Sequence, residues 1–374
     1  MIETKEVEGD RSALILSVFP ILSVIEGSPR IVISEHSDQV KELKEQLQNA
    51  FVSTKNSDRK ELRFIEQVPD DITSFEMAVS NFIALELQTE KEAPAFRDDL
   101  PVEIQVLSHD NIPLRVYHMG DVTNEPLLVI PPCGMPKELY INWIKKLAVH
   151  YFVINWEARG LFVDPNMLQD VPYSLEDQTK DLFSVIDHWE FDKVHLLGLC
   201  GGVVVGLNAC QTNEKRFASL SSWHGDLDFG SASEKTLHQK NTLSLMNMGA
   251  KSRSDAAMIH KQLMSKPSVL NALSEEIAHL VLYPYASPEL FYNYSRLNGE
   301  LMSIDATALT QGLQLPMLIV TSKEDNTAHP DGSNYLSKLL PHAIYIEEEQ
   351  GPHIAVFTAP QKLVEHQLHF LGAQ

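Results

Sequence analysis

The sequence predicts an α/β protein built on a mostly parallel sheet with helices on both faces. Residues 102–107 and 112–118 alternate apolar and polar side chains around a turn at 108–111, which predicts a hairpin. Beyond it, short apolar runs of strand length alternate with segments of helical spacing, a pattern typical of a parallel sheet covered on both sides. Further strands are expected at 127–130, 151–155, 194–197, 218–222, 316–321 and 343–346, and helices at 137–149, 175–188, 202–211, 333–340 and 360–370.

The composition is that of an ordinary soluble globular protein. Of the 374 residues, 44% are hydrophobic and 22% are charged, which suits one large domain and a smaller one. The formal net charge of -21 argues against nucleic acid and anionic membrane surfaces as partners. Three cysteines make no disulfide framework, the first six residues are too acidic for a signal peptide, and no apolar run has the length of a membrane span. We therefore expect a cytoplasmic protein.

A polar, charged stretch with one proline at residues 88–99 predicts a linker. Before it, a strand is expected at 29–34 and helices at 38–51 and 71–87, so that residues 1–95 form a small N-terminal α/β domain. This domain carries no recognisable chemistry, and we expect it to serve packing or to form a homodimer. Residues 96–374 are expected to form the main domain.

Residues 229–314 interrupt the alternation of the main domain with a long, largely helical insertion, which predicts a helical cap. The insertion is rich in methionine and aromatic residues, namely Met246, Met248, Met258, Met264, Tyr283, Tyr285, Phe291, Tyr292 and Tyr294. These side chains either form the apolar wall of a pocket for an acyl chain or ring, or only hold the insertion against the sheet. Both interpretations stay open.

Residues 198–202, Gly-Leu-Cys-Gly-Gly, place a thiol where a predicted strand turns sharply into a predicted helix. This is the pattern of a nucleophile elbow with Cys200 in place of serine. The helix N-terminus favours a thiolate, and the backbone N–H of Gly201 would form half of an oxyanion hole. A dinucleotide-binding turn needs glycine at its first, third and sixth positions, which here are Gly198, Cys200 and Val203, so its spacing excludes it. The alternative that Cys200 is a small buried core residue stays open.

On this elbow and the order of strands and helices, the chain from about residue 102 to its end resembles the α/β-hydrolase superfamily. The resemblance implies an eight-stranded sheet with the nucleophile after the fifth strand, an acid after the seventh and a histidine after the last. Asp325 matches the acid, with Glu324 and Asp331 as nearby competitors, and His353 on its Gly-Pro turn matches the base. Cys200, Asp325 and His353 then stand in the family's order, with the acid orienting the imidazole.

The same resemblance implies further site residues. The second oxyanion donor is expected in the loop after the third strand, where Met135 or Gly134 can offer a backbone N–H. Cys133 would be a wall residue near the nucleophile or its oxidation partner. Trp223 and His224, at the end of the sixth strand, would face the pocket, where His224 could contact substrate.

A cysteine at this position is similar to the polyhydroxyalkanoate synthases, certain cysteine thioesterases and the dienelactone hydrolases. The resemblance implies an acyltransferase or thioesterase that takes an acyl group from a small-molecule or carrier-linked thioester or ester and forms an acyl-cysteine. Hydrolysis of an ester or lactone, or acyl elimination in secondary metabolism, is the enzymatic alternative on the same triad. A binding scaffold with an inert cysteine is the alternative without catalysis. No phosphate loop or metal-ligand spacing is evident, so neither a cofactor nor a metal is expected.

Overall fold

The structure is a computed structural model of the chain and describes residues 22, 28–34, 37–53, 61–88, 100–162 and 171–372. The chain divides into two units. The first unit comprises residues 1–100, 160–170 and 251–293, and the second comprises residues 101–159, 171–250 and 294–374. Apart from residue 88, the linker expected at 88–99 lies outside the described residues.

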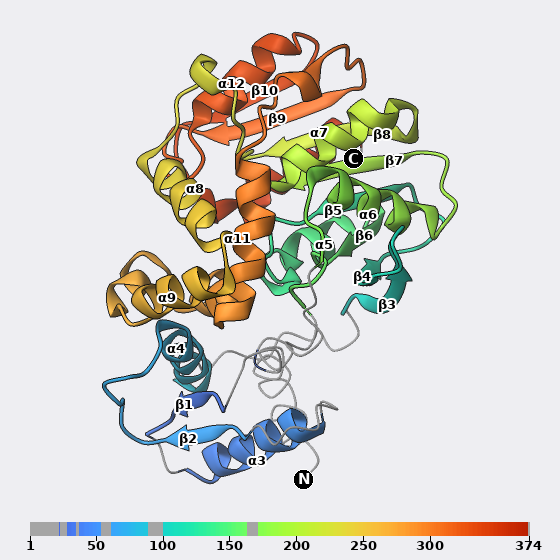
Figure 1. Ribbon diagram of the computed structural model, residues 1–374. Coiled ribbons are helices and arrows are strands. Elements are labelled where there is room, and N and C mark those ends of the chain that lie inside the picture. Colours follow the sequence, from blue (N-terminus) through green and yellow to red (C-terminus); the bar gives the residue numbers. More distant parts are fainter. Residues whose placement is uncertain are drawn as a thin grey trace. The chain divides into compact units, whose positions relative to one another are not determined.

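The second unit is built on an eight-stranded sheet, which confirms the predicted fold class (Figure 1). Only β4 runs antiparallel, to β3 and to β6, and all other neighbouring strands are parallel. In sheet order the strands are β10 (Ile344–Glu348), β9 (Met317–Ser322), β8 (Phe217–Trp223), β7 (Val194–Leu199), β5 (Pro126–Ile130), β6 (Phe152–Trp156), β4 (Pro113–Met119) and β3 (Val102–Leu107).

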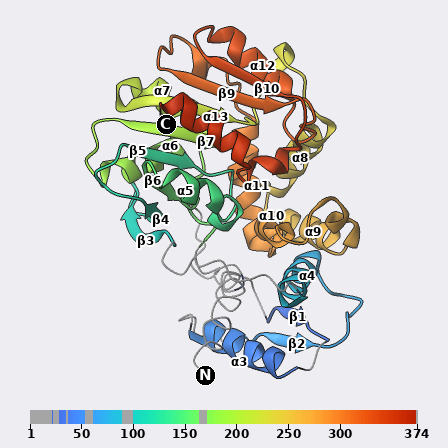
Figure 2. The same cartoon turned by 180° about the vertical axis from the view of Figure 1, so that it is seen from behind.

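Helices cover both faces of this sheet. Figures 1 and 2, which view opposite sides, show α6 (Leu175–Asp187) and α7 (Gly202–Asn213) on one face and α5 (Ile141–Leu147) and α13 (Gln361–Leu371) on the other. The central strands are therefore buried on both sides, and Leu127, Leu128 and Val129 of β5 are all 0% exposed. A continuous apolar run is what such a strand requires. The unit also contains α8 (Leu237–Gly249), α12 (Pro330–Leu339), the 3-10 helices η1 (Lys137–Leu139), η3 (Glu214–Arg216), η4 (Gly230–Ala232), η7 (Ala308–Thr310) and η8 (His353–Val356), and, from residue 294 on, α11 (Pro288–Met302).

A buried ion cluster ties the hairpin loop to a helix of the sheet's cover. The Arg159 side chain is 0% exposed, and its guanidinium donates to Asp181 of α6 at 2.5 and 2.7 Å and to Asp110 of the β3–β4 loop at 2.9 and 3.1 Å. The N–H donors of a guanidinium point in fixed directions, and two carboxylates that face it can accept from them in place of water. Arg159 thus holds three chain segments together at the carboxyl end of β6.

The first unit contains a two-stranded parallel sheet of β1 (Arg30–Val32) and β2 (Arg63–Ile65). The strand β2 was not expected from the sequence. The helices of the first unit are α3 (Asp38–Ser53), α4 (Ser74–Gln88), α9 (Arg253–Met264), α10 (Ala278–Val281) and the first residues of α11. The unit also contains the 3-10 helices η5 (Pro267–Ala272) and η6 (Tyr283–Tyr285). The helical content expected over residues 229–314 is therefore present. No helix among the described residues is long and apolar enough to cross a membrane.

Within the first unit, helix α4 packs on segments that follow it by almost two hundred residues. The Ser74 hydroxyl lies 3.1 Å from Met264 O and 3.0 Å from Lys266 O, and the rings of Phe82 and His279 stack with centroids 4.2 Å apart. The division therefore differs from the expected boundary between residues 95 and 96, because residues 251–293 join the N-terminal segment. Helix α4 thus packs on α10 and η5, which both lie within residues 251–293.

We expect Arg159→Met to lower the free energy of unfolding by about 3 kcal/mol, because it leaves the buried carboxylate of Asp181 without its partner. Urea denaturation followed by circular dichroism measures this loss. Arg216→Met is the matched control: Arg216 pairs with Asp187, whose side chain is 57% exposed, and should cost no more than about 1 kcal/mol. Equal losses in the two variants would contradict the role given to Arg159.

Candidate active site

The nucleophile elbow lies between β7 and α7. Cys200 has a φ of +52°, in the left-handed region that side chains other than glycine adopt at a cost. Its N–H donates to Trp223 O at 3.0 Å, and its carbonyl accepts from Val203 N at 3.2 Å. A Cβ on Gly202 would lie 2.6 Å from Pro131 O, so the helix can start here only with glycine. Neighbouring strands therefore hold Cys200 in a conformation that it would not adopt by itself.

The carboxylate of Asp325, in the loop after β9, accepts four hydrogen bonds. Its Oδ2 lies 2.8 Å from His353 Nδ1 and 2.8 Å from His224 Nδ1. Its Oδ1 accepts from the backbone N–H groups of Thr327 at 2.9 Å and Ala328 at 2.8 Å. Burial opposes ionisation, but the hydrogen bonds from the two imidazoles and the positive charge they can carry hold the pKa of Asp325 well below its usual range. Asp325 is therefore ionised and acts only as an acceptor.

The two competing acids have other partners. Glu324 accepts from Gly351 N at 3.1 Å, and Asp331 accepts from Glu234 N at 2.8 Å. Neither carboxylate bonds to His353.

His353 begins η8, directly after β10, and is 6% exposed. Because Asp325 can only accept, the proton of the neutral ring stays on Nδ1, and Nε2 presents a lone pair. This Nε2 is buried and has no hydrogen-bond partner in the described part of the chain, so no bond joins it to the Cys200 thiol. Such contacts are often long before substrate binds. The imidazole is thus prepared to take up one proton.

The Cys200 thiol is neutral at rest. Burial raises its pKa well above the ordinary value, the negative charges of Asp226 and of Cys133 raise it further, and a hydrogen bond from Gly201 N–H opposes them. The expectation that the helix N-terminus makes a thiolate is therefore outweighed by burial. A neutral thiol is a weak nucleophile until a base removes its proton.

The loop after β5 changes the expected oxyanion hole. Met135 N–H, expected as the second donor, donates to Pro132 O at 3.1 Å in a tight turn. No backbone carbonyl in the described residues accepts from Cys133 N–H. Gly201 N–H faces the Cys200 sulfur, as its effect on the pKa of that thiol requires. Gly134 N–H likewise has no backbone acceptor there, so Cys133 and Gly134 both keep a free backbone donor in this loop.

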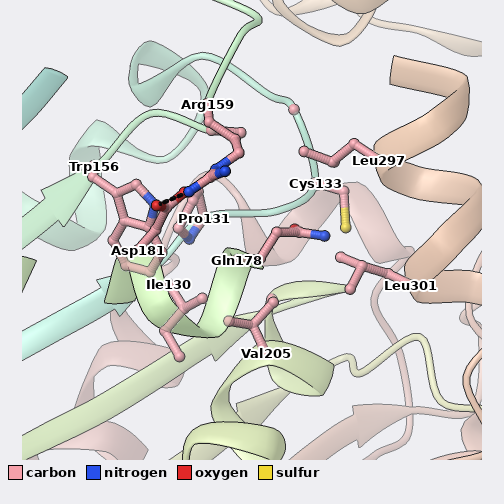
Figure 3. A pocket seen from close by; sticks show the side chains of 13 residues that line it. Ile130, Pro131, Cys133, Trp156, Arg159, Gln178, Asp181, Val205, Leu297 and Leu301 are labelled. Carbon is pink, nitrogen blue, oxygen red and sulfur yellow. Dashed lines mark hydrogen bonds and ion pairs between the residues drawn. The ribbon is translucent and has the colours of Figure 1, made fainter. Parts of the chain in front are cut away.

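Cys133 itself packs against the elbow. A Cβ built on Gly201 would lie 2.2 Å from the Cys133 sulfur, so the two residues are in direct contact. Burial raises the pKa of Cys133 to about 12. Figure 3 shows Leu297 and Leu301 of α11 pointing toward this thiol.

The cavity beside Cys133 has a volume of about 20 Å³, room for about one water molecule. Gly134, with a φ of +65°, lines it together with Cys133, Leu297 and Leu301. None of the methionine and aromatic residues expected to form an apolar wall lines this cavity. Several of them are packed elsewhere instead, and Tyr283, for example, stacks on Phe162 at 5.0 Å.

Trp223 and His224, both expected to face the pocket, are buried and bonded to other side chains. Trp223 is 0% exposed, donates from Nε1 to Gln367 Oε1 at 2.8 Å and packs its ring 4.9 Å from that of Trp143. Side chains alternate along a strand, so Trp223 at the end of β8 points into the core. His224 is 3% exposed, and its Nδ1 bonds to Asp325.

The sequence analysis missed Asp226. Its Oδ1 accepts from Gln239 Nε2 at 2.6 Å, while Gln239 Oε1 accepts from Thr236 N and His329 N, which fixes the orientation of the amide. Burial raises the pKa of Asp226, and the hydrogen bond from Gln239 opposes the rise. The available signal was its position three residues after β8, because the carboxyl ends of parallel strands meet at one edge of the sheet.

Among the described residues, two groups of three have potential metal-ligating atoms within 4.8 Å of one another: His224, Asp325 and His353, and His109, Asp110 and Asp181. In the first group the three side chains already bond to one another, and in the second the guanidinium of Arg159 neutralises both carboxylates. Hydrogen bonds and ion pairs therefore account for both clusters.

Comparisons with known proteins agree with this fold. No family model matches the chain. Two curated relatives are both named carbamate hydrolase RutD. The one from Caulobacter segnis is 21% identical over 70% of this chain and 97% of its own length. The one from Pseudomonas savastanoi is 23% identical over 69% of this chain and 98% of its own length.

Solved structures show the same fold. A hydrolase from Pseudomonas aeruginosa has a TM-score of 0.58, 18% identity, and covers 72% of this chain and 98% of its own. An esterase from Thermogutta terrifontis has a TM-score of 0.54, 16% identity, and covers 73% and 98%. A bromoperoxidase from Bacillus anthracis has a TM-score of 0.55, 16% identity, and covers 72% and 100%.

The contact between Gly201 and Cys133 predicts a non-additive pair. Gly201 has a φ of −62°, which alanine adopts freely, so only the Cys133 sulfur opposes Gly201→Ala. We expect this variant to lose about 2 kcal/mol of unfolding free energy through overpacking. Cys133→Ala removes the sulfur and leaves its Cβ 3.8 Å away, an ordinary contact. The double variant should then be about 1 kcal/mol more stable than the two single losses predict, as read from urea midpoints, and simple additivity would refute the contact.

Asp325 should also make stability depend on pH. Its folded pKa lies below the unfolded value of about 3.9, so its contribution is complete above that value and is lost as the pH falls. We expect Asp325→Asn to be less stable than the native chain by about 2 kcal/mol at pH 7 and the difference to shrink between pH 5 and pH 3. Melting temperatures of both proteins, measured across this pH range, test this expectation. A difference that stays constant would show that Asp325 is not held as an ionised acceptor.

Proposed function

The chain is an α/β-hydrolase-fold protein, and on that premise we propose that it is an acyl-transfer enzyme with a Cys200–His353–Asp325 triad. It takes an acyl group from a thioester or ester, carried by a small molecule or a carrier, and holds it as an acyl-cysteine. The main support is the state of His353: its Nδ1 is bonded to an ionised carboxylate, and its buried Nε2 has no partner among the described residues. A buried imidazole nitrogen without a hydrogen-bond partner lowers the stability of the fold. Such a nitrogen is free to accept the proton of a nucleophile during catalysis.

The first half-reaction uses each of these groups once. The Cys200 proton passes to His353 Nε2, the sulfur forms a bond to the carbonyl carbon, and the carbonyl electrons move to its oxygen. The N–H of Gly201, with a free N–H of the Cys133–Gly134 turn, stabilises that oxyanion. When the oxyanion collapses, the bond to the leaving group breaks, and the leaving group takes the proton from His353. Asp325 stabilises the imidazolium in between without taking its proton.

The second half-reaction depends on the acceptor. An alcohol, amine, thiol or water gives its proton to His353 and attacks the acyl-cysteine, and the Cys200 thiol is restored. Cysteine favours a thioester intermediate that an acceptor other than water can intercept. Hydrolysis is the second candidate, favoured by the names of the curated relatives, both carbamate hydrolases. The distribution of product between water and added acceptors separates the two.

The test is acylation by p-nitrophenyl acetate, followed by intact mass spectrometry and peptide mapping. We expect one acetyl group on Cys200, none on Cys200→Ala, and acylation about 100-fold slower in His353→Ala because the thiol then has no base. Cys210→Ala is the matched control, since Cys210 is a buried residue of α7 and should not affect the rate.

Two results would refute the triad. One is that His353→Ala is acylated as fast as the native chain. The other is that the acetyl group maps to Cys133, since that thiol is buried beside the same elbow.

A further inference from the structure

We propose that His224 is a positioning residue that shares the acid of the triad with His353 and so limits how strongly His353 holds a proton. The inference rests on the proposed function, because the proton in question is the one His353 takes from Cys200. It assigns to His224 a role other than the substrate contact expected from the sequence.

Both imidazoles use the same oxygen. His224 Nδ1 and His353 Nδ1 each lie 2.8 Å from Asp325 Oδ2, and the ring centroids are 5.7 Å apart with an interplanar angle of 75°. An ionised carboxylate donates no hydrogen bond, so both rings carry a proton on Nδ1. The geometry therefore describes a carboxylate with two equivalent donors at one oxygen, where a triad needs only one.

The backbone holds His224 in this place. Its φ of +47° lies in the left-handed region, and its N–H donates to Val320 O at 2.8 Å. Strands β8 and β9 pair in parallel with Trp223 opposite Val320, so the ends of both strands bring His224 and Asp325 together. A backbone conformation unfavourable for most side chains, at a buried residue that points to the acid, indicates a constraint on the position of that imidazole.

The shared oxygen has a consequence for His353. When His353 becomes an imidazolium, it must attract a carboxylate whose Oδ2 already accepts from His224, so the attraction is weaker than for an undivided acid. Besides Asp325, the charge of His353 acts on Asp226 after β8 and on His238 of α8, and the charge of Asp325 acts on Cys200.

The chain offers a matched pair of variants at this position. In His224→Asn the side-chain amide nitrogen occupies the place of Nδ1 and can donate to Asp325, and in His224→Leu a methyl group of the same branching cannot. Acylation rates by p-nitrophenyl acetate are measured from pH 5 to pH 9 for the native chain and both variants. In His224→Leu the acidic half-maximum should move up by about 0.5 pH and the plateau rate should fall about fivefold, because Asp325 then serves His353 alone and is less firmly oriented. In His224→Asn both should stay close to the native values.

Proton NMR of the full chain with ¹⁵N-labelled histidine gives a readout that needs no activity. The native chain should show two strongly downfield Nδ1–H signals, both lost or shifted in Asp325→Asn, and His224→Asn should retain only the signal of His353. A single such signal in the native chain overturns the proposal. So does a pH profile of folded His224→Leu that superimposes on the native profile. A pH profile of His224→Asn that matches that of His224→Leu overturns it as well. If His224→Leu does not fold, the signals of the native chain and of His224→Asn decide alone. If the native chain is never acylated, the proposed function fails while the two signals still report whether His224 shares the acid.

Discussion

The hydrogen bonds to Asp325 join the ends of three strands of the second unit. The carboxylate follows β9, His224 follows β8 and His353 follows β10, so one ionised side chain fixes how three loops meet. The two backbone N–H groups on its other oxygen prevent rotation of the carboxylate. Burial would neutralise an acid without such donors. The position of the base, and with it any chemistry at Cys200, depends on this charge remaining in place.

Much of the fold could be predicted because local patterns determine it. The apolar runs that became β5 to β10 and the helical spacing of α6 and α13 require only neighbours in the sequence. The strand β2 was missed because its three residues are too few for a pattern. The boundary of the first unit was missed for a different reason: helix α4 shows an apolar face in the sequence, but not which distant segment covers it.

The candidate site also has features that the sequence predicts and features that depend on distant contacts. The order of Cys200, Asp325 and His353 along the chain could be recognised, since each follows a strand. The choice of oxyanion donor could not, because it depends on which N–H a turn consumes, and the turn from Pro132 to Met135 consumes one. Trp223 was expected to face the pocket, but its indole bonds to Gln367 of α13, a partner that the local pattern does not show. The partner of His224 required knowing that β8 and β9 are neighbours in the sheet.

The first unit is assembled from three separate stretches of chain, and two of them, residues 160–170 and 251–293, lie inside the sequence of the second unit. The chain therefore enters and leaves each unit several times. Cutting the gene at residue 96, where the sequence suggests a linker, would separate α4 from the backbone carbonyls that face Ser74 and would leave the ring of His279 without Phe82. Neither fragment would then correspond to a natural folding unit, and an isolated hydrolase domain is better designed by replacing residues 251–293 as well.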